Sequence, residues 1–178
     1  RYGTVTGVQT CALPISQVQI PGVGAVSIRE VQEKVVIPDT GSPWDEWGEY
    51  DPAAKNMELR RWVVEVCAED GETTLVGDLS AHPIWYGPSP GSRCQNIGIS
   101  LSAPWRGKGI GAVAQRLLAE QLHDEGVVRV EASTDVENIA EQRSLAKAGF
   151  KLEGVIRGAQ MRADGRHDIQ GWSHLPGD

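Results

Sequence analysis

The stretch "PWRGKGIG" at residues 104–111 combines three glycines with two cations, Arg106 and Lys108. Because glycine carries no Cβ, the backbone amides of such a stretch can approach a ligand closely. Amides at the start of a helix also bind anions, since their N–H groups lack partners and the helix dipole is positive there. Residues of these types at this spacing predict a loop that holds phosphate. The compound that carries the phosphate then decides the function.

Two common phosphate-loop patterns can be compared with this stretch. Gly107, Gly109 and Ala112 match the dinucleotide pattern GxGxxG/A, and Glu131 follows about 20 residues later. A dinucleotide-binding domain begins with this unit and continues through further strand and helix pairs. Here strands precede the unit, and one helix and a hairpin complete the chain, so we reject that interpretation. The Walker pattern, GxxxxGK followed by Ser or Thr, does not occur.

The spacing of apolar residues predicts the elements that position this loop. Alternating apolar residues favour four strands before it, at 17–31, 59–68, 73–87 and 95–102. Helical spacing predicts two helices after it, at 110–126 and at 135–149 with Asp135 as the N-cap. The remaining elements are a strand at 127–134 and a hairpin formed by 150–162 and 166–175. The order is therefore strands, helix, strand, helix and two strands.

Residues 37–57 are rich in Pro, Gly and Asp, and at most a short helix fits there. Trp44 and Trp47 either line a substrate mouth or anchor this long loop to the body of the protein. We favour the anchoring role, because large apolar side chains are usually buried.

Two motifs carry a resemblance to a known family. "RGKGIG" at 106–111 and "ENIAEQRSLAKAGFKLEG" at 137–154 stand in the order found in the GNAT acetyltransferases, and the chain resembles their bacterial-type RimJ/RimL-like branch from about residue 59 onward. The resemblance implies the α+β class and the GNAT-type acetyltransferase fold, a mostly antiparallel twisted sheet with splayed central strands flanked by helices. We expect one acetyltransferase domain at 17–178. Residues 1–16 resemble a translated sequencing adapter, so we expect a non-native or disordered N-terminal segment there.

The resemblance also implies acetyl-CoA as the co-substrate and a primary amine as the acceptor, which attacks the thioester directly. The implied cofactor-binding residues are Leu101, Ser102, Arg106, Gly107, Lys108, Gly109, Ile110, Gly111 and Asn138. In the family the loop amides hold the pyrophosphate, the backbone of the preceding strand end pairs with the pantetheine arm, and the Asn contacts that arm from the other side. An ordinary strand end, an Asn that only caps its helix and a solvated loop are the alternatives.

The acid and the base of the reaction are less well specified. Many family members place a Tyr seven residues after the Asn, where this chain has Leu145, and the branch often places a Ser three residues after it, where this chain has Glu141. No acid therefore carries over, and water or Ser144 stays open.

For the base we favour Glu131, because Arg129, Glu131 and Ser133 share one face of a strand expected inside the sheet, which suggests a wet cleft. The alternative for Glu131 is a structural ion pair with an arginine. Asp78 is the second candidate for the base, followed by Glu65 on the neighbouring strand. A solvated face of the sheet is the alternative for both residues.

Composition limits the function further. A formal net charge of −7 argues against nucleic-acid binding and favours cationic partners, here a small-molecule or peptide amine. The Cys and His residues show no metal-ligand spacing, and no apolar run suits a membrane span or a signal peptide. We therefore expect no metal, a cytoplasmic location, and a monomer or homodimer. A module that binds acyl-CoA without turnover, as a sensor or scaffold, is the alternative function.

Overall fold

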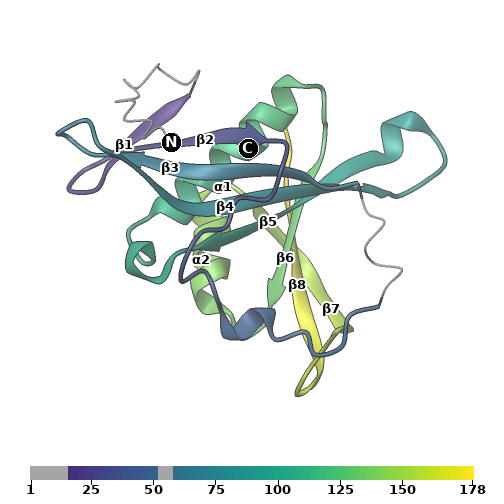
Figure 1. The fold of residues 1–178 in the computed structure, drawn as a ribbon. Helices are drawn as coiled ribbons and strands as arrows, with labels where there is room; N and C mark the ends of the chain where they lie inside the picture. The colour runs from purple at the N-terminus through teal and green to yellow at the C-terminus, as the bar shows by residue number, and fades with distance from the viewer. Residues whose placement is uncertain (1–15, 52–57) are drawn as a thin grey trace, which may run out of the picture.

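The computed structural model describes residues 16–51 and 58–178, and within these ranges the chain forms one eight-stranded sheet and two α-helices (Figure 1). The strands are β1 (Gln17–Ile20), β2 (Gly24–Val31), β3 (Arg60–Cys67), β4 (Thr73–Trp85), β5 (Arg93–Leu101), β6 (Val130–Asp135), β7 (Lys151–Arg162) and β8 (Gly165–His174). The helices are α1 (Ile110–Asp124) and α2 (Ile139–Lys147), and the 3-10 turns are η1 (Pro43–Asp45), η3 (Pro90–Ser92) and η4 (Ala103–Trp105). Residues 1–15 of the predicted N-terminal segment lie outside the described residues.

The sheet has the strand order β1-β2-β3-β4-β5-β6-β8-β7, and β5 and β6 are its parallel pair. The other neighbouring strands run antiparallel. The α+β class and the mostly antiparallel sheet expected from the sequence are therefore confirmed.

The parallel pair separates before its strands end. β5 and β6 are in register only where Gln95–Ile97 meets Val130–Ala132. β5 then continues to Leu101 and β6 to Asp135, and the two ribbons diverge (Figure 1). We call this separation of residues 98–101 from residues 133–135 the splay. It leaves backbone hydrogen-bonding groups on β5 without a partner strand.

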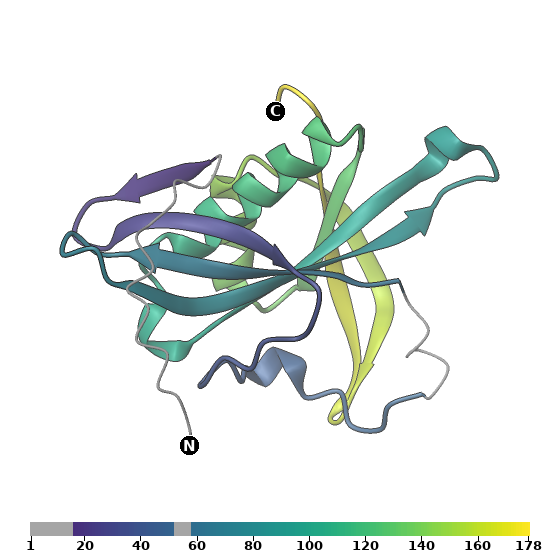
Figure 2. The same ribbon diagram turned by 45° about the horizontal axis from the view of Figure 1, so that its top comes forward.

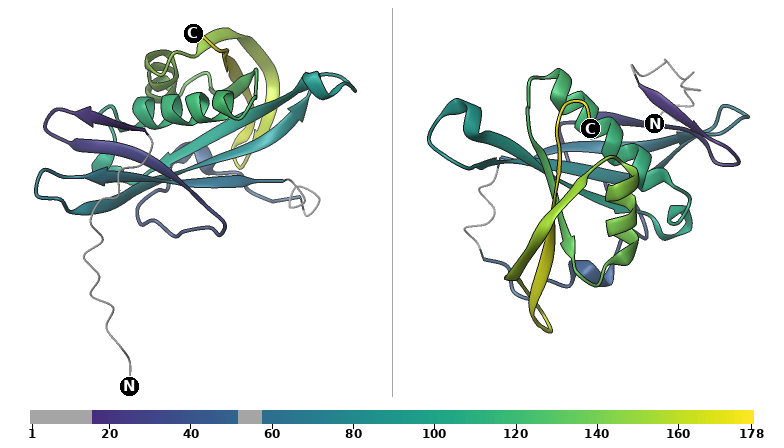
Figure 3. Two further views of the ribbon diagram at one scale, coloured as in Figure 1. Left: turned by 90° about the horizontal axis from the view of Figure 1, so that it is seen from above. Right: turned by 180° about the vertical axis from the view of Figure 1, so that it is seen from behind.

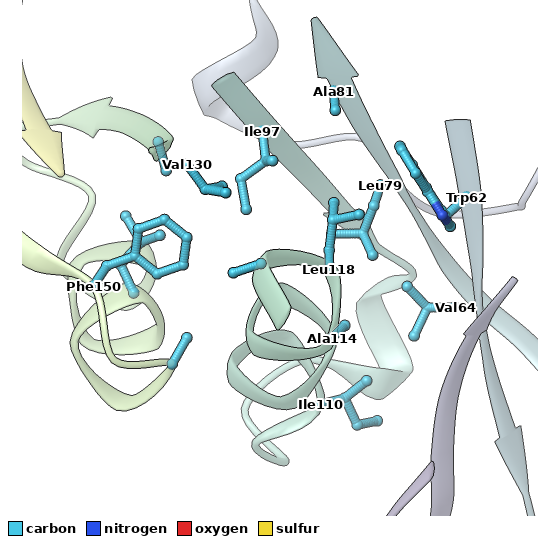
Figure 4. Close-up of a cluster of buried hydrophobic side chains, with 14 of the residues drawn as sticks. Trp62, Val64, Leu79, Ala81, Ile97, Ile110, Ala114, Leu118, Val130 and Phe150 are labelled. Carbon is cyan, nitrogen blue, oxygen red and sulfur yellow. The ribbon is translucent and has the colours of Figure 1, made fainter. Parts of the chain in front are cut away.

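Both helices pack on one face of the sheet, and residues 32–51 run over the other face (Figures 2 and 3). The side of α1 that faces the sheet carries apolar residues four apart, Ile110, Ala114, Leu118 and Leu122, all fully buried. They pack against strand residues that include Trp62, Leu79 and Val130 (Figure 4). Each large aliphatic side chain buried in this way contributes about 1.5–3 kcal/mol, so this core fixes where α1 begins.

Two local expectations differ from the structure. Residues 17–31 form two strands, because Pro21 and Gly22 make a turn in which the Val23 N–H donates to Ile20 O at 3.1 Å. The second helix is capped by Asn138, whereas Asp135 still belongs to β6. None of the helices in the described part of the chain is long and apolar enough to cross a bilayer.

Candidate active site

Helix α1 begins without a side-chain cap. Its N-cap residue is Gly109, whose φ of 82° lies in the left-handed region that glycine adopts without strain. The first amides of a helix have no partner within the helix, so those of Ile110, Gly111 and Ala112 are directed at whatever lies before α1. This end of α1 has the geometry of an anion-binding helix N-terminus.

Gly111 brings α1 close to both of its neighbours. A Cβ at this position would lie 3.0 Å from Ser144 Oγ on α2, and 3.6 Å from Leu101 Cδ1 on β5. A larger side chain would push these elements apart, so this glycine serves packing rather than loop flexibility.

The two cations of the loop have different surroundings. Arg106 donates from Nε to Leu101 O at 2.8 Å, and from Nη2 to Thr40 O at 3.0 Å and Gly41 O at 2.8 Å. Lys108 is exposed, with its Nζ 4.9 Å from the ring centroid of Trp105. Arg106 therefore fastens the chain around residue 40 to the loop, and Lys108 is the cation placed to attract an anion at α1.

Strand parity decides which residues of β5 face the splay. The Gln95 N–H donates to Arg129 O at 3.2 Å, toward β6, and residues two apart on a strand direct their backbone groups to the same side. Ile99 and Leu101 therefore face the splay, whereas the Ser102 N–H donates to Val76 O at 2.8 Å within the sheet. Of the two residues predicted to pair with the pantetheine arm, Leu101 is suitably placed and Ser102 is not. Ile99 was not among the predicted residues but also faces the splay, as the parity of a strand ending at Leu101 could have indicated.

Asn138 lies where β6 leads into α2. Its N–H donates to Asp135 O at 3.0 Å, and its Oδ1 accepts from the Glu141 N–H at 3.2 Å. The capping role that the sequence left as an alternative is therefore present. Contact with a pantetheine arm stays a prediction.

Glu131 lies in the paired part of β6, opposite Asn96. Its side chain is 8% exposed, and its oxygens accept from Arg129 Nε at 2.5 Å and from Tyr86 Oη at 3.1 Å. The same guanidinium also pairs with Glu153. The register partner of Glu131, Asn96, lies about 16 Å along β5 from the last residue of that strand. Glu131 is therefore distant from the end of β5. These are the surroundings of the structural ion pair that the sequence left as the alternative for Glu131.

Asp78 lies nearer the splay. It is in register with Ser100, next to the last residue of β5, and since Leu79 enters the core, Asp78 points to the face opposite the helices. Burial raises the pKa of this half-buried carboxyl, while the charges of Lys34 and Arg61 oppose that shift. Glu65, in contrast, pairs with the exposed Arg29 at 2.7 Å.

The sequence did not predict a polar contact between the two helices. Gln115 on α1 is 1% exposed, and its Nε2 donates to the Glu141 carboxylate on α2. Ser144 Oγ donates to Gln115 Oε1 at 3.1 Å. Burial raises the pKa of Glu141 to about 7, although the hydrogen bond from Gln115 acts in the opposite direction. Helical spacing places these residues on facing sides, but only the packing of α1 against α2 shows that they meet.

Residues 37–47 are fastened at two places on the face opposite the helices. Near the loop, Arg106 holds residues 40 and 41; near the β7–β8 hairpin, the Ala163 N–H donates to Glu46 O at 2.9 Å. The Arg162 guanidinium lies over Trp44 and Trp47, at 5.8 and 5.4 Å from the ring centroids. These contacts agree with the anchoring role, but both tryptophans are only half-buried and Trp47 also lines a pocket, so anchoring and a substrate mouth both stay predictions.

Comparison with known proteins identifies the family. A family model described as an acetyltransferase (GNAT) domain matches residues 20–151. The chain belongs to the GNAT acetyltransferase family. The family expected from the two motifs is therefore confirmed. No curated protein matches the sequence.

Solved GNAT structures share the fold at low identity. The microcin self-immunity acetyltransferase MccE, in complex with acetyl-CoA and AMP, is 23% identical over 66% of this chain and 61% of its own, with a TM-score of 0.55. RimJ of Mycobacterium smegmatis, in complex with a CoA disulfide, is 23% identical over 70% of this chain and 56% of its own, also with a TM-score of 0.55. The aminoglycoside acetyltransferase AAC(6')-Ib, in complex with coenzyme A and kanamycin, is 18% identical over 68% of this chain and 69% of its own, with a TM-score of 0.53.

The chain thus spans about three fifths of the length of MccE. These likenesses establish the GNAT fold, with its mixed sheet of eight strands and its two helices. In the described part of the GNAT chain, no cluster of His, Cys, Asp and Glu could hold a metal ion.

Proposed function

We propose that the protein is an acetyl-CoA-dependent N-acetyltransferase whose acceptor, a primary amine, attacks the thioester directly. One observation carries the proposal: the uncapped start of α1 stands at the end of β5, whose last residues face the splay without a partner strand. An anion site and an open strand edge thus lie side by side. This is the pair of features that a pyrophosphate followed by an amide-bearing arm requires.

On the donor side, the amides of Ile110, Gly111 and Ala112 hold the pyrophosphate and Lys108 adds positive charge. Ile99 and Leu101 offer their backbone groups to the pantetheine arm. The Leu101 carbonyl already accepts from Arg106, so its N–H and the groups of Ile99 are the more suitable partners.

For the base we propose Asp78 in place of Glu131. Its position next to Ser100 places it near the end of β5, whereas Glu131 has both oxygens engaged. A carboxyl whose pKa is raised by burial is a stronger proton acceptor than an ordinary Asp. It takes a proton from the amine as the nitrogen forms its bond to the acetyl carbon.

The acceptor is a small-molecule or peptide amine, and the net charge of −7 favours one with additional positive charge. Structures of the same fold include a protein acetyltransferase, described as ribosomal-protein-alanine N-acetyltransferase, and an aminoglycoside acetyltransferase. We propose a cytoplasmic location, in keeping with the use of acetyl-CoA, and a monomer or homodimer without nucleic-acid or membrane partners.

Release of free thiol from acetyl-CoA, measured with a panel of amines and confirmed by the mass shift of each product, tests this function. We expect release that depends on the amine. Coenzyme A binding measured by calorimetry, together with no thiol release in the presence of any amine, would instead favour the acyl-CoA-binding module without turnover. Absence of coenzyme A binding would contradict both.

A further inference from the structure

The contact between Gln115, Glu141 and Ser144 joins the two helices that start on either side of the splay. Helix α1 follows the end of β5, and α2 follows the end of β6, where the Asn138 N–H donates to Asp135 O. Glu141 lies in the first turn of α2, and its partner Gln115 lies one turn after Gly111 on α1. The polar contact therefore spans the splay on the helix face of the sheet.

The same cluster adjoins the unpaired end of β5. Ser144 Oγ, which donates to Gln115, also lies 3.0 Å from where a Gly111 Cβ would be. Side-chain atoms of Leu101 and Ile99 lie 3.6 and 3.8 Å from that same point. These are the two residues whose backbone faces the splay. The cluster thus stands beside the strand edge that we assign to the pantetheine arm.

We propose that Glu141 is the proton donor to the departing coenzyme A thiolate, an inference that rests on the function proposed above. When the tetrahedral intermediate collapses, the carbon–sulfur bond breaks and its electron pair stays on sulfur. The Glu141 carboxyl O–H then gives its proton to that sulfur, which leaves as a thiol. The resulting carboxylate regains a proton from solvent, while the proton of the amine has gone to Asp78, so atoms and charges balance.

The surroundings of Glu141 suit an acid. Burial, the larger influence, raises its pKa to about 7, and the hydrogen bond from Gln115 opposes that shift without removing it. No charge on a neighbouring side chain contributes to the shift, and Gln115 and Ser144 are both neutral. A substantial fraction of the carboxyl is thus protonated at neutral pH, where an acid whose pKa is near the working pH is most effective.

The face on which Glu141 lies favours the role of acid over that of base. Glu141 is on the helix face, together with the start of α1, and this is the side of the donor. Asp78 and residues 37–47 are on the opposite face, which we assign to the acceptor. The Ser144 hydroxyl proton is already donated to Gln115, which makes Ser144 the weaker candidate.

The test is the ratio of kcat for the wild type to kcat for Glu141→Gln as a function of pH, with an amine found active in the panel. Ionisation of the amine and of Asp78 affects both proteins equally and cancels in this ratio. We expect a ratio of about 10 below pH 6, which is less than the roughly 10²–10⁴-fold usual for general acid catalysis because a thiolate is a fair leaving group. It should fall toward 1 as pH rises through about 7 and above.

Glu137→Gln is the matched control, since Glu137 is an exposed carboxylate just before α2, and its ratio should stay near 1 at every pH. Ser144→Ala should keep the wild-type pH profile. If Glu141→Gln does not fold, Glu141→Asp replaces it. Its shorter side chain should deliver the proton less effectively, so the ratio of wild-type kcat to variant kcat should exceed 1 below pH 6 and fall toward 1 as pH rises.

A ratio for Glu141→Gln that is independent of pH would mean that Glu141 only positions α2, and a pH-independent ratio for Glu141→Asp would mean the same. Either result, in a wild type that turns over, would overturn the acid role and leave the proposed function intact. A wild type that binds coenzyme A but acetylates no amine would overturn both.

Discussion

At the scale of single residues, the surroundings of a carboxylate separate structural from chemical roles. Glu131 accepts hydrogen bonds from Tyr86 and from Arg129, an arginine that it shares with Glu153, so its charge is already compensated. Asp78 is half-buried and has no such partner at hydrogen-bond distance within the described residues, so its charged form is disfavoured. A buried carboxylate without close compensation lowers stability but is a better proton acceptor.

Glu131→Gln and Asp78→Asn should therefore have opposite signatures. Losing the charged hydrogen bonds of Glu131 should cost about 1.5–3 kcal/mol and lower Tm by roughly 3–10 °C, with kcat of the folded fraction unchanged. Asp78→Asn should reduce kcat roughly 10²-fold while coenzyme A affinity is retained.

The pH dependence of Asp78 has a defined sign. Because its pKa is raised on folding, its ionisation costs stability once pH rises through that pKa, so Asp78→Asn should keep or increase Tm at pH 7. Melting curves and kcat values of Glu131→Gln and Asp78→Asn check these two predictions. A large loss of kcat in folded Glu131→Gln would return Glu131 to the mechanism.

At the scale of elements, the loop between β5 and α1 has two functions. Its backbone presents the start of α1, and its arginine donates to the nearby Leu101 carbonyl and fastens a distant segment through the carbonyls of Thr40 and Gly41. Two cations only two residues apart therefore differ in role, because one points back to the protein backbone and the other lies exposed beside Trp105.

Arg106→Ala and Lys108→Ala should separate these functions. Arg106→Ala should lower Tm and increase proteolysis within residues 37–47, since it weakens one of the two attachments of that segment, where the Ala103 N–H still donates to Asp39 O. Lys108→Ala should leave Tm nearly unchanged and weaken coenzyme A binding several-fold at low salt, with a smaller effect at high ionic strength because exposed charges are screened. Calorimetry at two salt concentrations and limited proteolysis are the measurements. Equal effects of both substitutions on coenzyme A affinity would contradict this division of roles between Arg106 and Lys108.

At the scale of the whole molecule, the end of α1 and the end of β8 are joined by two histidines. His123 Nδ1 donates to Val127 O at 2.6 Å, which leaves its Nε2 to accept from His174 Nδ1 at 3.0 Å. His174 is 5% exposed and packs edge-on against Phe150. Burial is the main reason why the pKa of His174 is lowered, and the nearby His123 acts in the same direction.

Stability should therefore decrease in weak acid. Because the pKa of His174 is lower in the folded protein than its ordinary value, the unfolded chain binds the proton first, and stability is lost as pH falls from about 7 toward the lowered pKa. His174→Asn should reduce this part of the pH dependence, although its Tm at pH 7 should fall because the Phe150 contact is lost. Melting curves between pH 7.5 and about 5 test the slope, and an unchanged slope in the variant would exclude His174 as its source.

Local signals were enough for the elements and for the start of the site. The helical period of Ile110, Ala114 and Leu118 and the turn at Asp164 and Gly165 act over a few residues, so they predict α1 and the β7–β8 hairpin without knowledge of the fold. The glycine loop and the later helix motif also indicated the family, which the family model confirms. The turn at Pro21 and Gly22 was visible in the sequence but was read as part of one strand.

The partners of the charged side chains were decided by the tertiary structure alone. Arg106 finds carbonyls more than 60 residues away, and Glu141 meets a glutamine from another helix. Glu131 is compensated by Tyr86, which lies 45 residues earlier in the chain. A sequence motif specifies which groups are present, but whether a carboxylate is compensated or left as an acid or base depends on burial and on neighbours brought together by packing.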